Sequence, residues 1–347
     1  MIAISAGSQS SYALLADGTL RAFGSNFFGE LGNGGTDNAL TPLAVAGLTD
    51  AVEVAGGGVH ACARLAGGAV RCWGQNDVGE VGDGTQLNRR GTPVEVAGLE
   101  GATGLALGFA HSCALTGEGS LYCWGSNSDG QLGDGAGEDH LVPAVVPGLT
   151  ELTSLAAGGL HTCGLDQRGV ASCFGANHVG QLGDGSVTQR STPVQVSGLG
   201  ALRAIAAGHE HSCAVTESGG LFCFGDNSAG QLGGEGSASS LPVEVGDLVE
   251  VVKVAAGRRH TCALLRGGRV ACWGGNTSGQ LGDGSTDARA AAAVIPELGD
   301  VVDLAAGDEH ACALSQSAGL FCWGSGAWGQ LGDGGEEDRA SPAPVLW

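Results

Sequence analysis

The chain repeats itself with a period of about fifty residues over its full 347 residues. The glycine that ends the segment Ala-Ala-Gly, or a variant of it, stands at positions 7, 57, 108, 158, 208, 257 and 307. A second marker, the hexapeptide GQLGDG and its variants, starts at positions 29, 79, 130, 180, 230, 279 and 329. Internal repeats of this length indicate one repetitive architecture rather than a set of unrelated domains. We therefore predict a single domain spanning 1–347, with repeats at approximately 1–50, 51–101, 102–151, 152–201, 202–250, 251–300 and 301–347.

Each copy contains three or four short strand-like segments separated by turn residues, as in EVVKVAAG, HTCALL, RVACWG and TPVQV. No apolar pattern with a helical period persists for three turns, so the fold class is all-β. Repeats of about fifty residues with four strands are typical of propeller blades. The first and last copies resemble the middle ones, whereas an open stack would need polar caps. The sequence thus predicts a closed ring of seven blades.

The repeat resembles that of the regulator-of-chromosome-condensation (RCC1) family. The pattern GxxHxCAL, then CWGxN, GQLGDG and PVxVxGL, recurs with variations through the seven copies, and WGSNSDGQLGDG (residues 124–135) matches it closely. The resemblance implies a seven-bladed β-propeller built from RCC1-like repeats. It implies function only weakly, because the family includes nucleotide exchange factors, a plant ultraviolet photoreceptor, ubiquitin-ligase modules and secreted bacterial inhibitors.

Charge and composition exclude several classes of function. The formal net charge is −21 and Lys253 is the one lysine, so the chain repels polyanions, and we expect no nucleic-acid partner. A phosphate-binding loop would need a Gly-Lys-Ser/Thr sequence, which is missing. No apolar run approaches the length of a membrane span, so we expect no membrane insertion. No set of nucleophile, base and orienting group emerges, and we predict a protein that is not an enzyme and has no cofactor.

Twelve cysteines form six pairs with a spacing of ten residues, each pair centred on a turn. Antiparallel strands leaving such a turn would set the two cysteines opposite each other, close to disulfide geometry. In the first copy, Tyr12 and Ala22 replace both members of the pair together. Reduced core thiols, or a metal held by His60, Cys62 and Cys72, are the alternatives, although such a site is one ligand short. The predicted disulfides are Cys62–Cys72, Cys113–Cys123, Cys163–Cys173, Cys213–Cys223, Cys262–Cys272 and Cys312–Cys322.

Two other repeated residue types are candidate metal ligands. One histidine recurs in six copies, at positions 60, 111, 161, 211, 260 and 310, with Ser10 in the first. A ring of imidazoles could bind metal or sense pH, but an imidazole that fixes contacts between blades is the favoured interpretation. The aspartates of the GDG motifs do not have EF-hand spacing and are ordinary turn formers. We predict no metal site.

Positions that differ among the copies are free to serve a partner. Two sets of loops vary most, one just before the repeated histidine and the other after GDG. By resemblance, the first set lies on a propeller rim that family members use for partners. Trp328 occupies a variable loop position where an aromatic side chain can anchor an interface. The predicted partner-binding residues are Phe109, His209, Glu210, Arg258, Arg259, Asp308, Glu309 and Trp328.

These observations predict a monomeric, secreted or periplasmic scaffold that binds a protein, with inhibition of an extracellular enzyme or adhesion as concrete versions. Disulfides persist in oxidising compartments, and we expect that a signal peptide, absent from MIAISAG, was removed or trimmed. The first alternative is an intracellular exchange factor for a small GTPase, and the second is a metal- or calcium-binding repeat protein. The last segment, APVLW, could complete its own blade or close the ring against IAISAG.

Overall fold

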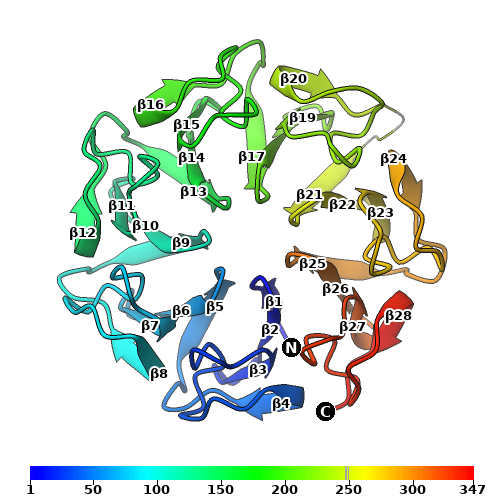
Figure 1. Ribbon diagram of the computed structural model, residues 1–347, viewed down its shortest axis with the longest axis horizontal. Helices are drawn as coiled ribbons and strands as arrows, with labels where there is room; N and C mark the ends of the chain where they lie inside the picture. Colours follow the sequence, from blue (N-terminus) through cyan, green and yellow to red (C-terminus); the bar gives the residue numbers. More distant parts are fainter. Residues whose placement is uncertain (247, 249) are drawn as a thin grey trace.

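The computed structural model describes residues 1–246, 248 and 250–347. Its strands form seven four-stranded antiparallel sheets, which surround a central axis as a seven-bladed β-propeller (Figure 1). In every blade the strands follow chain order from the inner strand, beside the axis, to the outer strand at the circumference. The all-β, seven-bladed prediction is therefore confirmed. The described residues contain no helix with the length and hydropathy of a membrane span.

The strands are distributed evenly among the blades. The first three blades contain β1 (Ala3–Ala6), β2 (Ser10–Leu14), β3 (Leu20–Gly24), β4 (Ala39–Ala44), β5 (Ala51–Gly56), β6 (His60–Leu65), β7 (Val70–Gln75), β8 (Arg89–Glu95), β9 (Ala102–Leu107), β10 (His111–Thr116), β11 (Leu121–Gly125) and β12 (His140–Val145). The next two contain β13 (Leu152–Ala157), β14 (His161–Asp166), β15 (Ala171–Gly175), β16 (Arg190–Gln195), β17 (Leu202–Ala207), β18 (His211–Thr216), β19 (Leu221–Gly225) and β20 (Ser239–Glu244). The last two contain β21 (Val251–Ala256), β22 (His260–Leu265), β23 (Arg269–Gly274), β24 (Arg289–Val294), β25 (Val301–Ala306), β26 (His310–Ser315), β27 (Gly319–Gly324) and β28 (Arg339–Pro344).

The ring closes without exchange of a strand between the two ends of the chain. β28 pairs with β27 in the seventh blade, and β1 pairs with β2 in the first, so each blade is one contiguous stretch of chain. Specific bonds join the first and last blades, because the Ile4 amide donates to Asp303 Oδ2 at 3.0 Å and Ser11 Oγ lies 2.9 Å from His310 Nε2. The question that the sequence left open is thus answered: the last strand completes its own blade.

The hydrophobic core lies between neighbouring blades. Its largest members share one position on the third strand of each blade, and all are fully buried: Phe23, Trp73, Trp124, Phe174, Phe224, Trp273 and Trp323. In six of the seven blades, the second glycine of the GQLG motif or its variant packs against the aromatic ring of the next blade; the nearest side chain to Gly233 is Val245 of its own blade. At Gly82 the backbone has φ +75°, and an added Cβ would lie 2.7 Å from Trp124 Nε1. The motif recurs because a side chain there would collide with the neighbouring blade and would strain the backbone.

Candidate protein-binding face

The loops that vary in sequence gather at one end of the propeller. Ser10 at the start of β2 pairs with Gly24 at the end of β3. The loop between the first and second strands of this blade and the loop between its third and fourth strands therefore emerge at the same end. Equivalent pairings recur in the other blades, for example His60 with Gly74 and His310 with Gly324. We call this end the mouth face. The turns between the second and third strands of the blades lie at the opposite end, which we call the turn face.

A circle of main-chain hydrogen bonds around the axis joins the loops between the first and second strands of neighbouring blades. In each blade, the amide of the residue after the repeated glycine donates to a carbonyl of the next blade. Ser8 donates to Gly57 at 3.0 Å, and the last bond, from Asp308 to Ser8 at 3.1 Å, closes the circle between the seventh and first blades. The side chains of these residues are therefore carried on a fixed frame, while their identity is left free.

Three of the predicted partner-binding residues line an axial hollow of about 190 Å³ on the mouth face, Phe109, His209 and Asp308. Its remaining wall consists mainly of glycine and alanine. The rings of Phe109 and His209 meet edge to face, with centroids 6.3 Å apart, and Phe109 is 43% exposed. Burial raises the pKa of Asp308, and the nearby His209 and Arg258 oppose this rise. An apolar ring and a carboxylate thus stand at the same opening.

The other charged residues predicted for the partner site surround this opening. His178 Nε2 lies 2.9 Å from a carboxylate oxygen of Glu210, which joins loops of the fourth and fifth blades. Glu309 lies 3.4 Å from the hydroxyl of Ser278. Arg258 and Arg259 are both exposed in the β21–β22 loop. Acids and bases therefore alternate across the fifth, sixth and seventh blades. The equivalent positions of the second and fourth blades hold glycine and an aliphatic residue, Gly58-Val59 and Gly159-Leu160.

Trp328 is half-buried, because it has an aromatic neighbour that the sequence did not reveal. Its ring packs edge to face with Phe27, with centroids 5.3 Å apart, across the seam between the seventh and first blades. Phe27 is the more accessible of the two, at 53% exposed. Phe27 belongs to the β3–β4 loop, so the pair also lies on the mouth face. A large aromatic surface is therefore available beside the charged loops.

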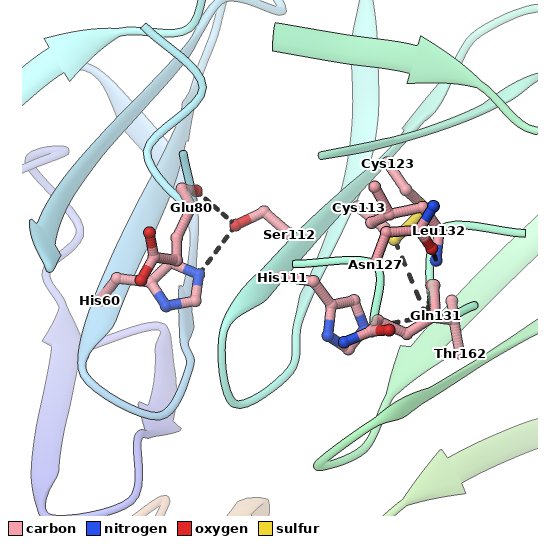
Figure 2. Close-up of a disulfide and its surroundings, with 10 residues drawn as sticks. All are labelled: His60, Glu80, His111, Ser112, Cys113, Cys123, Asn127, Gln131, Leu132 and Thr162. Atoms are coloured by element: carbon pink, nitrogen blue, oxygen red, sulfur yellow. Dashed lines mark hydrogen bonds between the residues drawn. A yellow bond between two sulfur atoms is a disulfide. The ribbon is translucent and has the colours of Figure 1, made fainter. Parts of the chain in front are cut away.

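The repeated histidines join neighbouring blades, as Figure 2 shows for His60 and Ser112. Each lies at the start of a second strand, fully buried. In five of the six, Nε2 lies 2.7–2.9 Å from a serine or threonine hydroxyl of the next blade. That hydroxyl in turn donates to a main-chain carbonyl of the preceding blade, as Ser112 does to Glu80 at 2.9 Å. Because a hydroxyl has one proton, Nε2 must be the donor to it. We call this arrangement the histidine latch.

Burial keeps the latch imidazoles neutral. Desolvation lowers the pKa of His60, His161 and His260 to about 3 and that of His111, His211 and His310 to about 4. A glycine fits closely against each ring, since a Cβ on Gly108 would lie 2.0 Å from His111 Cε1. The latch is therefore a structural device, in agreement with the favoured interpretation of the repeated histidines.

One latch is incomplete. The partner position for His260 is occupied by Ala311, which has no hydroxyl, and His260 Nε2 is buried without a hydrogen-bond partner among the described residues. The first blade has Ser10 in place of histidine, and there the next blade carries Ala61, so both members are missing. Tyr12 compensates in that blade, because its hydroxyl accepts from Ser10 at 3.0 Å and donates to the Glu30 carbonyl at 2.8 Å.

The six cysteine pairs are joined as disulfides within single blades. Each pair bridges the second and third strands at directly opposed positions, such as Cys113 and Cys123 (Figure 2). The Cα atoms are 4.0 or 4.1 Å apart in all six. Tyr12 faces Ala22 at the equivalent place in the first blade. The metal alternative fails at these residues, because Cys62 is bonded to Cys72 and His60 bonds to Ser112.

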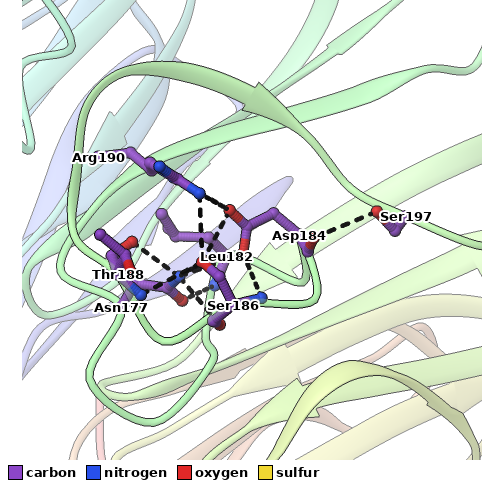
Figure 3. Close-up of polar contacts among 7 residues, drawn as sticks. All are labelled: Asn177, Leu182, Asp184, Ser186, Thr188, Arg190 and Ser197. Carbon is purple, nitrogen blue, oxygen red and sulfur yellow. Dashed lines mark hydrogen bonds and ion pairs between the residues drawn. The ribbon is translucent and has the colours of Figure 1, made fainter.

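The GDG aspartates brace the long loops between the third and fourth strands of the blades, such as the β15–β16 loop (Figure 3). Asp184 accepts from the Ser186 amide at 2.9 Å and pairs with Arg190 at 2.9 Å. Asn177, the asparagine of the CWGxN pattern in the fourth copy, receives the Leu182 amide at 3.0 Å and donates to carbonyls across the loop. Hydrogen bonds within the loop thus occupy the carboxylate. The described residues contain no cluster of three His, Cys, Asp or Glu side chains suited to a metal ion.

The architecture and the varied mouth face define a β-propeller repeat scaffold. Models of the Regulator of chromosome condensation (RCC1) repeat match six segments, at 1–30, 51–80, 103–131, 202–231, 251–280 and 301–330, and a second set of five at 17–64, 118–165, 173–215, 218–264 and 267–314. The chain therefore belongs to the RCC1 repeat family.

Solved structures share the whole fold at low sequence identity. Yeast RCC1 (Prp20) bound to Kap60 superimposes with a TM-score of 0.86 and 24% identity over 96% of this chain and 85% of that one. Human WBSCR16 gives 0.85 and 22% identity over 95% of each chain. These likenesses show the fold alone.

Curated relatives match shorter segments. The ultraviolet-B receptor UVR8 of Arabidopsis thaliana is 32% identical over 147 residues, which are 41% of this chain and 33% of the receptor. The human E3 ubiquitin-protein ligase HERC2 is 31% identical over 138 residues, 39% of this chain and 3% of the ligase. The alignments thus span a third or less of either relative.

Proposed function

We propose that this protein is an extracytoplasmic scaffold that binds another protein through its mouth face. The observation that carries the proposal is that the main-chain hydrogen bonds around the axis recur in every blade, whereas the side chains on these loops differ. The same circle of main-chain bonds recurs through all seven blades, while the residues mounted on it change from glycine to Phe109, His209, Arg258 and Asp308. Loops held by a rigid scaffold are a common place for binding residues.

The composition of the face supports a protein as the partner. Partly exposed aromatic rings of Phe109, Phe27 and Trp328 share the mouth face with the exposed Arg258 and Arg259. Aromatic residues and arginine are enriched in protein interfaces. The hollow of about 190 Å³ is smaller than the pockets that usually hold drug-sized ligands.

The disulfides support the location. Six bonds in a chain of 347 residues are typical of proteins that mature in an oxidising compartment. The alternative is an intracellular exchange factor for a small GTPase. Prp20p from Saccharomyces cerevisiae, which shares the propeller fold, binds Gsp1p and histones. An intracellular exchange factor would face a reducing environment, so the disulfides favour the extracytoplasmic proposal over that alternative.

The proposal is tested by affinity capture from the medium or periplasm of the native source with matched charge reversals. Arg258→Glu changes the mouth face. Arg266→Glu changes an arginine of the turn face that is 73% exposed. We expect a captured protein that is retained by R266E and lost, or weakened at least tenfold, in R258E and in Phe109→Ala. A partner that binds all three variants equally would place the interface elsewhere and overturn the proposal.

A further inference from the structure

The outer strand of the sixth blade, β24, differs from the other six outer strands at its free edge. A proline stands in the middle of each of the others, at Pro42, Pro93, Pro143, Pro193, Pro242 and Pro342. The equivalent residue of β24 is Ala292, within the sequence RAAAAV. Proline removes an N–H group from an edge strand and so discourages another strand from pairing with it. This protection is missing in β24.

The register of β24 shows where the N–H of Ala292 points. Ala293 pairs with Cys272 of β23, and the Ile295 amide donates to Val270 at 2.9 Å. The N–H and C=O groups of successive residues in a strand point to opposite sides. Those of Ala292 and Val294 therefore point away from β23 and out of the blade. Val294 is also one of the exposed aliphatic side chains. The open groups of Ala292 and Val294 form what we call the β24 edge.

A second protection is missing at the same strand. In the six other blades, the outer strand receives a hydrogen bond from the preceding blade. A glycine in the loop between that blade's third and fourth strands donates its N–H to a carbonyl of the outer strand, as Gly185 does to Ser240 at 2.9 Å and Gly284 to Ala340 at 2.9 Å. The glycines concerned have φ between +81° and +87°. Before β24 the equivalent residue is Glu235, for which that left-handed conformation is costly. Among the described residues, no such loop bond reaches Ala290.

Both changes fall on one strand of seven, and from this coincidence we propose that the β24 edge binds an extended segment of a partner protein, which adds to the blade as a fifth strand. Strand addition of this kind takes its affinity from main-chain hydrogen bonds and its specificity from flanking side chains. The site lies at the circumference and is separate from the mouth face. It does not depend on the function proposed above.

Charge indicates what kind of segment fits. Exposed acidic residues lie beyond both ends of the edge, Asp287 before it and Glu297 after it, and Glu235 lies in the preceding loop. Arg289, the first residue of β24, is also exposed, but its guanidinium pairs with Asp283 at 3.2 Å. The middle of the strand carries only alanine and valine. The best occupant is therefore a strand with small or β-branched residues in its middle and basic residues at its ends.

A second copy of this chain fits less well. Antiparallel pairing of two β24 strands centred on Ala292 would set Asp287 of one copy against Glu297 of the other, and opposed like charges destabilise a pair of strands. Two chains of net charge −21 also repel each other at long range.

The test uses the whole protein with its disulfides intact and two capped heptapeptides, Lys-Thr-Val-Thr-Val-Thr-Lys and the same sequence with glutamate at both ends. We expect the basic peptide to bind and to slow amide hydrogen exchange at Ala292 and Val294. Ala292→Pro, which copies the other six blades, should weaken binding about tenfold, the effect of losing roughly one hydrogen bond. Glu235→Gly should also weaken it, by restoring the loop glycine, and Glu235→Gln separates that effect from loss of charge.

Two controls make the result decisive. Pro193→Ala returns an N–H to an outer strand whose preceding loop still donates through Gly135, so it should add no binding. Arg258→Glu on the mouth face should leave peptide binding unchanged. Failure of the basic peptide to bind, equal binding to A292P, or preference for the acidic peptide would overturn the proposal. A dimer in sedimentation that A292P abolishes would overturn the choice of occupant.

Discussion

Replacing Ala311 with serine should stabilise the protein, because it completes the one histidine latch that lacks its hydroxyl. His260 Nε2 is buried there and has no hydrogen-bond partner within the part of the chain that the structure describes. A serine hydroxyl at residue 311 could accept from His260 and donate to the Gln280 carbonyl, which receives Trp323 Nε1 at 2.9 Å. The same carbonyl can serve both donors, since Ser112 and Trp124 share the Glu80 carbonyl in this manner in the third blade.

The magnitude follows from the bonds gained. A buried donor without a partner costs about 1–3 kcal/mol, and a typical hydrogen bond contributes about 0.5–1.5 kcal/mol net. Burying the new hydroxyl offsets part of this gain. We expect A311S to raise the free energy of unfolding by about 1–2 kcal/mol, measured by urea denaturation at neutral pH without reductant.

Ala61→Ser is the matched control. Its neighbour in the preceding blade is Ser10, not histidine, and the Glu30 carbonyl already receives Tyr12 at 2.8 Å and Trp73 at 2.7 Å. A serine there gains no free acceptor, so A61S should be neutral or destabilising. If A311S fails to gain stability, or if A61S gains as much, the latch is not the source of cohesion between blades that we take it to be.

Three further predictions concern the latch and the disulfides. The buried imidazoles stay neutral in the folded protein down to about pH 4–3, whereas those of the unfolded chain bind protons near pH 6.5. The free energy of unfolding should therefore fall as the pH falls through this window. His111→Gln should make that decline shallower by about 1.4 kcal/mol per pH unit, measured by urea titrations between pH 6 and 4.5. Gly108→Ala should cost about 3 kcal/mol or more, since its Cβ would lie 2.0 Å from His111 Cε1, whereas Gly137→Ala, with open space around it, should stay within about 0.5 kcal/mol in the same assay. Replacing Cys163 and Cys173 together by serine should cost about 2–3 kcal/mol and leave the far-ultraviolet dichroism unchanged; a cost near zero would contradict a role for the bond in stability.

Much of the fold could be predicted from the sequence because its determinants are local. A turn midway between Cys62 and Cys72 fixes the hairpin register, and the paired replacement by Tyr12 and Ala22 marks the same opposed site in the first blade. The repeat period then fixes the number of blades. None of these inferences needs knowledge of how one blade meets the next.

The features that the sequence did not reveal all depend on contacts between blades. The partner position lies about fifty residues further along the chain, except for His310, whose partner Ser11 is in the first blade. The empty latch at His260 therefore becomes visible only once Ala311 is placed beside it. The sequence predicts Trp328 as an isolated anchor, yet its neighbour Phe27 comes from the opposite end of the chain. The proline of the outer strands stands in every copy but the sixth, where Ala292 replaces it. This difference becomes interpretable only once the structure shows that the N–H of Ala292 points to the free edge of the strand.

The most direct test of the account is the state of the cysteines in protein isolated from its native source under conditions that trap free thiols. The account predicts that alkylation before reduction adds no label, that alkylation after reduction adds twelve, and that each disulfide-linked peptide pair comes from a single blade. Twelve labels before reduction, or sulfur bonds between different blades, would contradict both the self-contained blade and the oxidising compartment inferred from it.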